Sequence, residues 1–185
     1  IVTNPLDVMT YFAYKTLKIP PSKVFGMGIT LDASRFANLI SEELHVPVTD
    51  VNPCVIGSHG ETMLPLARFT HAGKKKLTDL MPDAAVRSLV ERTVNRGKEI
   101  VSLYGTGSAY FAPSAAIAAI VRAIIKDQHI GLGVSAYLSG EYGMNDICIG
   151  VPCIIGRQGI ERIVTLDLNN TEKQQLETSA ESIRQ

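Results

Sequence analysis

His59 lies in a glycine-flanked turn within the stretch CVIGSHGE, which runs from Cys54 to Glu61. An apolar run that we expect to be a strand leads into this turn, and Gly57 and Gly60 remove side-chain bulk on either side of the histidine. Backbone of this kind can approach a ligand closely, and an imidazole can act there as a general acid or base. The sequence therefore predicts proton chemistry at His59.

A carboxylate and a guanidinium, Asp32 and Arg35, are supplied by the motif LDASRF. Their spacing of three residues places both side chains on one face of a helix. Asp32 could hold His59 in one tautomer and stabilise its protonated form, while Arg35 could bind a substrate carboxylate through two parallel hydrogen bonds. A purely structural role for Asp32, as an acidic residue near a helix start, is favoured by the residues alone.

Two helices are expected to position these groups. VTNPLD begins a helix that should run to about Lys18, with Asp7 in its first turn and Asn4 as either its N-cap or a ligand contact. Apolar residues at helical intervals predict a second helix over residues 31–44, with Asp32 in its first turn. After the strand before His59, MLPLARFT is expected to be a second extended run.

The remainder of the chain alternates helical and extended patterns. A long amphipathic helix is expected from Asp83 to Leu103, and a break rich in glycine and serine separates it from a helix over PSAAIAAIVRAIIK. IGLGVSAYL, DICIGVPCIIG and ERIVTLDL read as strands, and a capped helix starting at Thr171 closes the chain. We therefore predict one compact unit of the α+β class.

Composition narrows the functional classes. The 185 residues include 18 Lys and Arg and 18 Asp and Glu, so no net charge attracts nucleic acid or an anionic membrane. A small-molecule ligand is the better expectation.

The cysteines are odd in number and lack CxxC spacing, which argues against a disulfide framework or a metal site and favours a reducing, cytoplasmic location. No apolar run reaches membrane-spanning length, and IVTNPLD reads as if the chain began within a longer protein.

Other features of the sequence give weaker evidence of function. Gly131, Gly133 and Ala136 have the GxGxxA spacing of a dinucleotide site, but they fall inside an expected strand and do not open a helix. Ser58 beside His59 does not form the GxSxG motif of a serine hydrolase. Ordinary surface roles suit the three other histidines, which are His45, His71 and His129.

NPLDVM, LDASRF, IGSHGETMLP, GSAYFAP, SAYLSGEYG and GVPCIIG, in that order, closely resemble the C-terminal half of the lactate/malate dehydrogenase family. The resemblance covers essentially the whole chain. It implies a fold of twisted antiparallel sheets packed with long helices, NAD as cofactor and assembly into homodimers or homotetramers. It also implies a partner half, N-terminal in the family, that carries the glycine-rich NAD-binding unit.

The resemblance also implies roles for single residues. His59 matches the histidine that exchanges a proton with the substrate, Asp32 the aspartate that orients it, and Arg35 the arginine that clamps a carboxylate. Asn4 matches an asparagine that contacts both the substrate carbonyl and the nicotinamide ribose. The pocket would be lined further by Leu6, Met63 and the run Gly107 to Ala109, of which Gly107 and Ser108 would contact substrate and Met63 the cofactor.

Within the family, two features resemble malate dehydrogenases of the branch most similar to lactate dehydrogenases. Gly107 stands where typical lactate dehydrogenases carry a bulkier threonine, and the smaller residue leaves space for a second carboxylate. HGETM resembles the HGDTM of malate enzymes, although Glu61 replaces the usual aspartate. The implied substrates are malate and oxaloacetate. The alternatives are another 2-hydroxyacid dehydrogenase, such as a lactate dehydrogenase, or a non-catalytic assembly module, and we expect little or no turnover from this half alone.

Overall fold

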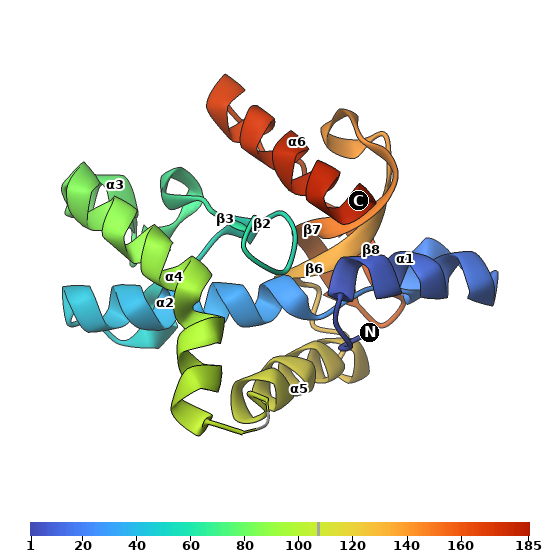
Figure 1. The fold of residues 1–185 in the computed structure, drawn as a ribbon, viewed down its shortest axis with the longest axis horizontal. Coiled ribbons are helices and arrows are strands. Elements are labelled where there is room, and N and C mark those ends of the chain that lie inside the picture. Colours follow the sequence, from blue (N-terminus) through green and yellow to red (C-terminus); the bar gives the residue numbers. More distant parts are fainter. Residues whose placement is uncertain (107) are drawn as a thin grey trace.

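The structure is a computed structural model that describes residues 1–106 and 108–185, and its largest sheet has three antiparallel strands in the order β6-β7-β8. The strands are β6 (Ile130–Ser139), β7 (Asn145–Gly156) and β8 (Gly159–Ile163). The central strand β7 is buried along most of its length, because Ile, Val and Cys side chains occupy both of its faces. This sheet is the framework on which the helices pack (Figure 1).

Five long helices lie in the part of the chain that the structure describes. They are α1 (Leu6–Leu17), α2 (Gly28–Leu44), α4 (Asp83–Tyr104), α5 (Phe111–Ile125) and α6 (Asn170–Arg184), and a single short turn forms α3 (Leu77–Leu80). In Figure 1, α2 runs across the middle of the molecule and α4 crosses it. α2 contacts both β6 and α4, while α1 contacts β6 and β7. α2 therefore links the sheet to the helical side of the molecule.

Short strands build the region between α2 and α4. One small sheet pairs β1 (Val51–Asn52), β4 (His71–Ala72) and β5 (Lys75–Lys76), and β2 (Val55–Ile56) pairs with β3 (Leu64–Pro65). Single 3₁₀ turns occur at Pro21–Lys23, Val48–Asp50, Ala67–Phe69 and Glu141–Gly143. The β2–β3 connection contains His59. Its position is fixed by an isolated antiparallel bridge between Gly57 and Gly150 of β7.

Buried apolar side chains form two clusters. The larger one lies between the main sheet, α5 and α6, and the smaller one lies between α2, α4 and the strands β1 and β2. Cys54, Cys148 and Cys153 are all unpaired. In the part of the chain that the structure describes, no helix combines the length and apolar character needed to cross a membrane.

Several helix boundaries correct the expectations from the sequence. Asn4 is not an N-cap, because Pro5 precedes the first residue of α1 and no side chain caps this helix. α2 begins at Gly28, three residues earlier than predicted, so Asp32 lies in the second turn and is fully buried. The structural role favoured for Asp32, near a helix start, is therefore wrong. The last helix begins at Asn170, one residue earlier than predicted, behind a capping box of Asn169 and Glu172.

The extended regions also differ in detail. Only Leu64 and Pro65 of MLPLARFT form a strand, since the chain then enters a 3₁₀ turn, and β8 ends at Ile163. Gly57 has a positive φ of 93°, and a Cβ there would lie 2.8 Å from a Leu64 methyl and 2.9 Å from the Ser179 hydroxyl. Its lack of a side chain therefore serves packing inside the protein. Gly60 is exposed and has open space around it.

We predict that Gly150→Ala destabilises the fold by about 1–3 kcal/mol through overpacking. An added Cβ would lie 2.0 Å from a side-chain carbon of Ile29 and 2.5 Å from the Gly57 carbonyl oxygen, so both the α2 contact and the bridge that holds the His59 turn would have to move. Urea unfolding measures the effect. Gly131→Ala, in the neighbouring strand β6 with nothing within 4 Å of its added Cβ, is the matched control. Equal midpoints for the two variants would contradict the prediction.

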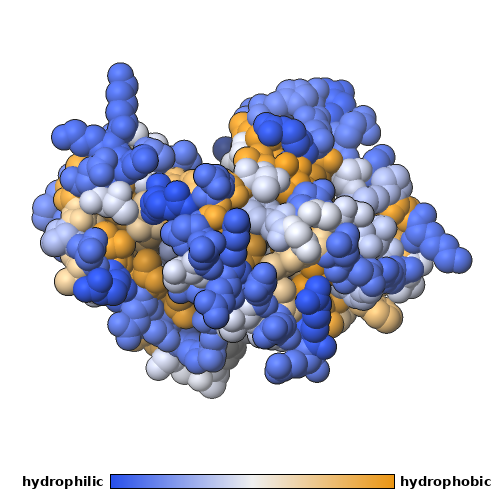
Figure 2. All heavy atoms as spheres, turned by 90° about the horizontal axis from the view of Figure 1, so that it is seen from above, coloured by the Kyte–Doolittle hydropathy of each residue, from blue (hydrophilic) through white to orange (hydrophobic). Residues whose placement is uncertain are grey.

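Large apolar side chains remain exposed on three helices. Phe12 of α1, Leu103 of α4 and Phe111 of α5 are 64%, 81% and 70% exposed. In Figure 2, apolar residues, coloured orange, are exposed at several places on a largely hydrophilic surface. An apolar cavity of about 300 Å³ also lies beside the N-terminal residues and is lined by Val2, Phe25 and Ile120 among others. Contiguous exposed apolar surface is typical of an interaction site, whereas single exposed apolar side chains are common on soluble proteins.

Candidate active site

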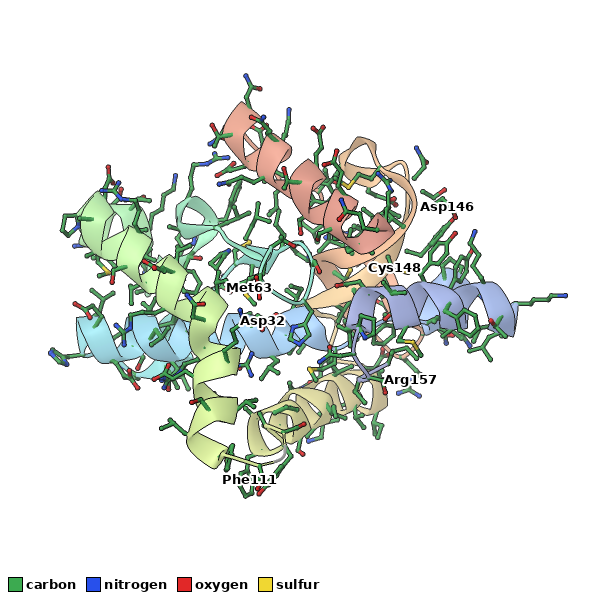
Figure 3. The ribbon with its side chains drawn as sticks, viewed as in Figure 1. Asp32, Met63, Phe111, Asp146, Cys148 and Arg157 are labelled. Carbon is green, nitrogen blue, oxygen red and sulfur yellow. The ribbon has the colours of Figure 1, made fainter. Side chains whose placement is uncertain are left out.

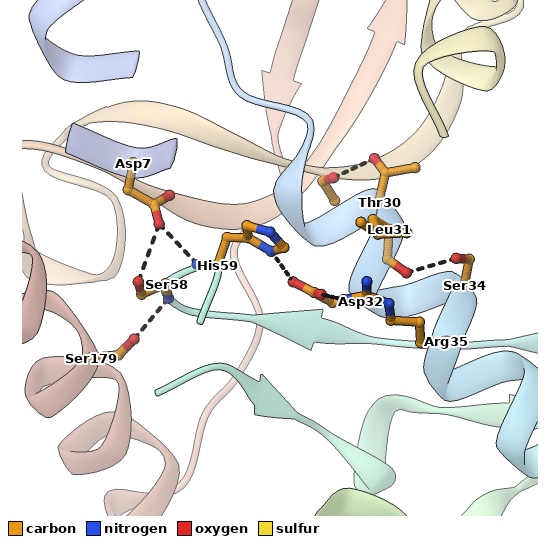
Figure 4. A network of polar contacts seen from close by, with 10 residues as sticks. Asp7, Thr30, Leu31, Asp32, Ser34, Arg35, Ser58, His59 and Ser179 are labelled. Carbon is orange, nitrogen blue, oxygen red and sulfur yellow. Dashed lines mark hydrogen bonds and ion pairs between the residues drawn. The ribbon is translucent and has the colours of Figure 1, made fainter. Parts of the chain in front are cut away.

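Asp32, Arg35 and His59 meet around one carboxylate (Figure 4). His59 Nδ1 lies 2.6 Å from Asp32 Oδ2, and Arg35 Nη1 donates a hydrogen bond of 3.2 Å to Asp32 Oδ1. The Asp32 side chain is fully buried, whereas 16% of the His59 and 10% of the Arg35 side chain remain exposed. The structure thus brings together the three side chains that the sequence singled out, two from α2 and one from the β2–β3 turn.

Close packing of backbone makes this meeting possible. A Cβ at Gly28, the first residue of α2, would lie 2.6 Å from His59 Cβ and 2.3 Å from a Leu6 methyl. Only glycine allows the start of α2, the His59 turn and α1 to approach this closely. Helical spacing then places Arg35 one turn beyond Asp32 on the same face.

The pKa of His59 is raised above its ordinary value. Burial lowers it, but the hydrogen bond and the charge of Asp32 raise it, the charge of Asp7 raises it further, and the charge of Arg35 opposes them. Because the folded pKa exceeds the unfolded one, protonation of His59 stabilises the fold below the ordinary histidine pKa, and this contribution is lost as pH rises through the raised value. With Nδ1 facing Asp32, Nε2 is the nitrogen left to exchange a proton with a ligand.

Arg35 has a hydrogen-bond donor that no described residue uses. Its Nε is buried and has no hydrogen-bond partner among the residues that the structure describes. α4 lies against the guanidinium at Gly97, where an added Cβ would be 3.2 Å from Nη1. An unpaired buried N–H is costly, and a planar carboxylate is the ligand that the guanidinium fork matches best. The arrangement therefore suits an anion bound next to His59.

The other candidates that the structure describes form no hydrogen bond with Asp32, Arg35 or His59. Asn4 is exposed, and Gly107 lies outside the described residues. Met63 is 7% exposed and packs in the smaller core cluster, and Leu6 is 2% exposed. Ser108 is exposed on the α4–α5 connection and forms no hydrogen bond to Asp32, Arg35 or His59. Figure 3 labels Asp32 near the centre and Phe111, which follows this connection, at the lower edge.

Asp7 is the residue of this site that sequence reasoning missed. It is 3% exposed, and its Oδ2 accepts hydrogen bonds from the backbone N–H of His59 at 2.8 Å and the Ser58 hydroxyl at 3.2 Å. In the sequence, an aspartate in the first turn of a helix has a sufficient explanation in the helix dipole. No local signal distinguishes that role from a contact 52 residues away.

The other histidines lie away from this group. His129 lies between two carboxylates, with Nδ1 2.6 Å from Glu161 and Nε2 3.3 Å from Asp127. These three residues could supply metal ligands, but both ring nitrogens are already paired and His129 is exposed. His45 follows α2 as its C-cap, and His71 lies in β4. Glu61, beside His59, forms an ion pair with Lys98 of α4.

The sequence and the fold of the whole chain are similar to those of known proteins. A family model described as the lactate/malate dehydrogenase, alpha/beta C-terminal domain matches residues 29–185. Proteins named malate dehydrogenase from Staphylococcus epidermidis and Bacillus licheniformis are 48% and 46% identical to the chain, over 99% and 100% of its length. The chain covers 58% and 59% of these two proteins, so it spans about three fifths of the relatives it matches.

Solved structures show the same relation. A malate dehydrogenase from Salinibacter ruber superposes with a TM-score of 0.95 at 47% identity, over 98% of this chain and 59% of that one. A lactate dehydrogenase from Eimeria maxima, determined with NADH and oxamate, also reaches 0.95, at 37% identity, over 99% of this chain and 57% of that one. The fold and the order of its elements are therefore those of known dehydrogenases.

Proposed function

The chain belongs to the lactate/malate dehydrogenase family, and from that premise we propose that it is the substrate-binding part of a malate dehydrogenase that uses NAD. The reaction interconverts malate and oxaloacetate. The observation that carries the proposal is the shared Asp32 carboxylate, which contacts His59 through one oxygen and Arg35 through the other. Through these two contacts, a group that can exchange a proton lies beside a group that can bind an anion. A 2-hydroxyacid substrate requires both.

In the direction of malate oxidation, His59 takes the proton of the substrate hydroxyl at Nε2 as the C2 hydrogen leaves as hydride. Asp32 holds the ring by its other nitrogen and stabilises the imidazolium that forms. Arg35 binds the carboxylate next to C2 through the donors that Asp32 does not use. In the reverse direction, His59 returns the proton to the carbonyl oxygen of oxaloacetate. The raised pKa of His59 favours this protonated form in the free site.

The chemistry that NAD would supply, if bound, is acceptance of the hydride from C2. The described residues fit the reacting end of such a cofactor, since we propose that substrate lies at Nε2 of His59 and at the Nε of Arg35, which has no partner among the described residues. They do not suit its phosphates. The GxGxxA spacing lies inside β6, where its residues pair with β7 and open no helix, and a Cβ at Gly133 would be 2.5 Å from a methyl of Ile29. Most of the cofactor would be held by the part of the longer relatives that this chain does not span.

Malate is favoured over lactate on two grounds. The similar proteins from Staphylococcus epidermidis and Salinibacter ruber are both named malate dehydrogenase, at 48% and 47% identity. Glycine at position 107, where typical lactate dehydrogenases of the resembling family carry a bulkier threonine, would leave room for a second carboxylate. Asn4 and Ser108 remain proposed substrate contacts, with Asn4 and Met63 proposed near the nicotinamide.

The exposed apolar side chains of α1, α4 and α5 are proposed to pack against the cofactor-binding half or against further copies in a homodimer or homotetramer.

Fusion of the chain to the N-terminal two fifths of the Staphylococcus epidermidis relative tests the proposal. We expect the fused enzyme to oxidise NADH with oxaloacetate, and much more slowly with pyruvate, while the chain alone shows little or no turnover. Activity of the fused enzyme with pyruvate but not oxaloacetate would favour a lactate dehydrogenase instead. A folded, oligomeric fusion that oxidises NADH with neither acid would favour the non-catalytic assembly module.

A further inference from the structure

Asp7 is a buried acidic residue that the proposed reaction does not use. It belongs to the first turn of α1, yet its side chain caps no backbone group of that helix. Both hydrogen bonds of its Oδ2 go to the β2–β3 turn, one to the His59 backbone and one to Ser58. In Figure 4, Asp7 and Asp32 lie on opposite sides of His59 and come from different helices. His59 is thus bracketed by two carboxylates, one at its backbone and one at its ring.

The surroundings of Asp7 suit a carboxylate. Its contacts to His59 and Ser58 are both made with donors, and its Oδ1 is buried without a partner among the described residues. The pKa of Asp7 is raised above its ordinary value, because burial outweighs the hydrogen bonds from His59 and Ser58 and the positive charge of His59. A carboxylate is expensive to bury unless it is hydrogen-bonded and paired with a positive charge, and the β2–β3 turn supplies two hydrogen-bond donors.

The charged neighbours identify what Asp7 acts on. On α2, the groups facing His59 are Asp32 and Arg35, and on α1 it is Asp7. From β7, Cys148 faces Asp7, but burial raises the pKa of this thiol to about 12, so it stays neutral. From α6, the uncharged Ser179 and Ser182 contact the turn, Ser179 accepting the Ser58 backbone N–H at 2.8 Å and the Ser182 hydroxyl lying 2.9 Å from that of Thr62. The imidazolium of His59 is therefore the cation that Asp7 can stabilise.

We propose that Asp7 is a positioning residue for His59, which anchors the turn through the His59 backbone N–H and supplies a second negative charge that favours the imidazolium. The anchor fixes the backbone while Asp32 fixes the ring, so the distance between Nδ1 and Asp32 is set from two helices. What His59 does chemically rests on the proposed function. The placement of His59 by Asp7 rests on the hydrogen bonds of the Asp7 carboxylate and on its charge, and it can be tested without any enzymatic activity.

NMR spectroscopy of the 185-residue chain tests the proposal through two readouts, the titration of the His59 ring and the hydrogen exchange of the His59 amide. Asp7→Asn keeps a side-chain oxygen that can accept from this amide but removes the charge, and Asp7→Leu removes both. We expect Asp7→Asn to lower the pKa of His59 while its amide stays protected. Asp7→Leu should lower the pKa and also accelerate amide exchange by about tenfold or more, because a hydrogen bond to a charged group is lost.

Asp32→Asn is the reference variant, since it should lower the pKa of His59 without exposing the amide. An unprotected His59 amide in the unsubstituted chain would overturn the proposal by itself, even if no variant folded. An unchanged His59 titration in Asp7→Asn would also overturn it, because a merely structural Asp7 would leave the imidazole unaffected. Neither outcome depends on whether the fused enzyme accepts oxaloacetate, so the two proposals fail separately.

Discussion

His59→Asn is expected to reduce kcat/KM of the fused enzyme for oxaloacetate by about two to four orders of magnitude, the usual contribution of a positioned proton donor. Asparagine is polar and similar in size, but it cannot deliver a proton to the carbonyl oxygen. The loss should fall mainly on kcat, because Arg35 still binds the carboxylate. Steady-state oxidation of NADH across a range of oxaloacetate concentrations, with and without the substitution, measures both parameters.

His45→Asn is the matched control for this variant. His45 is exposed and has a left-handed conformation, with a φ of 54°, at the end of α2, and asparagine adopts this conformation readily. The same chemical change should therefore leave kcat/KM nearly unaltered at that position. A fused enzyme that retained full activity without the His59 imidazole would show that another group supplies the proton, and the assignment of His59 would be wrong.

Arg35→Leu is expected to destabilise the chain by about 3–5 kcal/mol, because it removes a partner from the fully buried Asp32. The effect should depend on pH. Below the raised pKa of His59 the imidazolium still faces Asp32, whereas above it Asp32 has no cation left, so the loss should grow as pH rises through that value. Urea unfolding of the unsubstituted and substituted chains at two pH values on either side of the His59 transition measures it.

Arg35→Lys separates the charge from the planar fork. Lysine keeps a positive group near Asp32, so most of the stability should remain, but it cannot bind a carboxylate through two parallel hydrogen bonds. In the fused enzyme we expect kcat/KM for oxaloacetate to fall by roughly 10- to 150-fold, since one hydrogen bond to a charged group contributes about 1.5–3 kcal/mol. Arg92→Lys is the control, because Arg92 is exposed and its ion pair with Glu43 is long, at 4.0 Å. Equal losses in the two lysine variants would contradict a clamp at Arg35.

Hydrophobic periodicity predicted most of the helices, because an amphipathic helix records its buried face in its own residues. α1 ends one residue before the predicted Lys18, and α4 covers the predicted run from Asp83 with one residue to spare. The start of α2 was misplaced because Gly28 is a poor helix former whose position is decided by packing against Leu6 and His59. The α+β class predicted from the pattern agrees with the helices and antiparallel sheets of the structure.

The sequence alone determined which side chains could do chemistry, since residue type and the i,i+3 spacing of Asp32 and Arg35 are local properties. It could not decide whether Asp32 was a surface acidic residue near a helix start or a buried orienting group. Only the tertiary structure decided that, by packing α2 against the His59 turn at Gly28. It also decided the role of Asp7, whose hydrogen-bond partners lie 51 and 52 residues further along the chain. Contacts of such separation follow from how helices and sheet pack together, and no pattern within a single element records them.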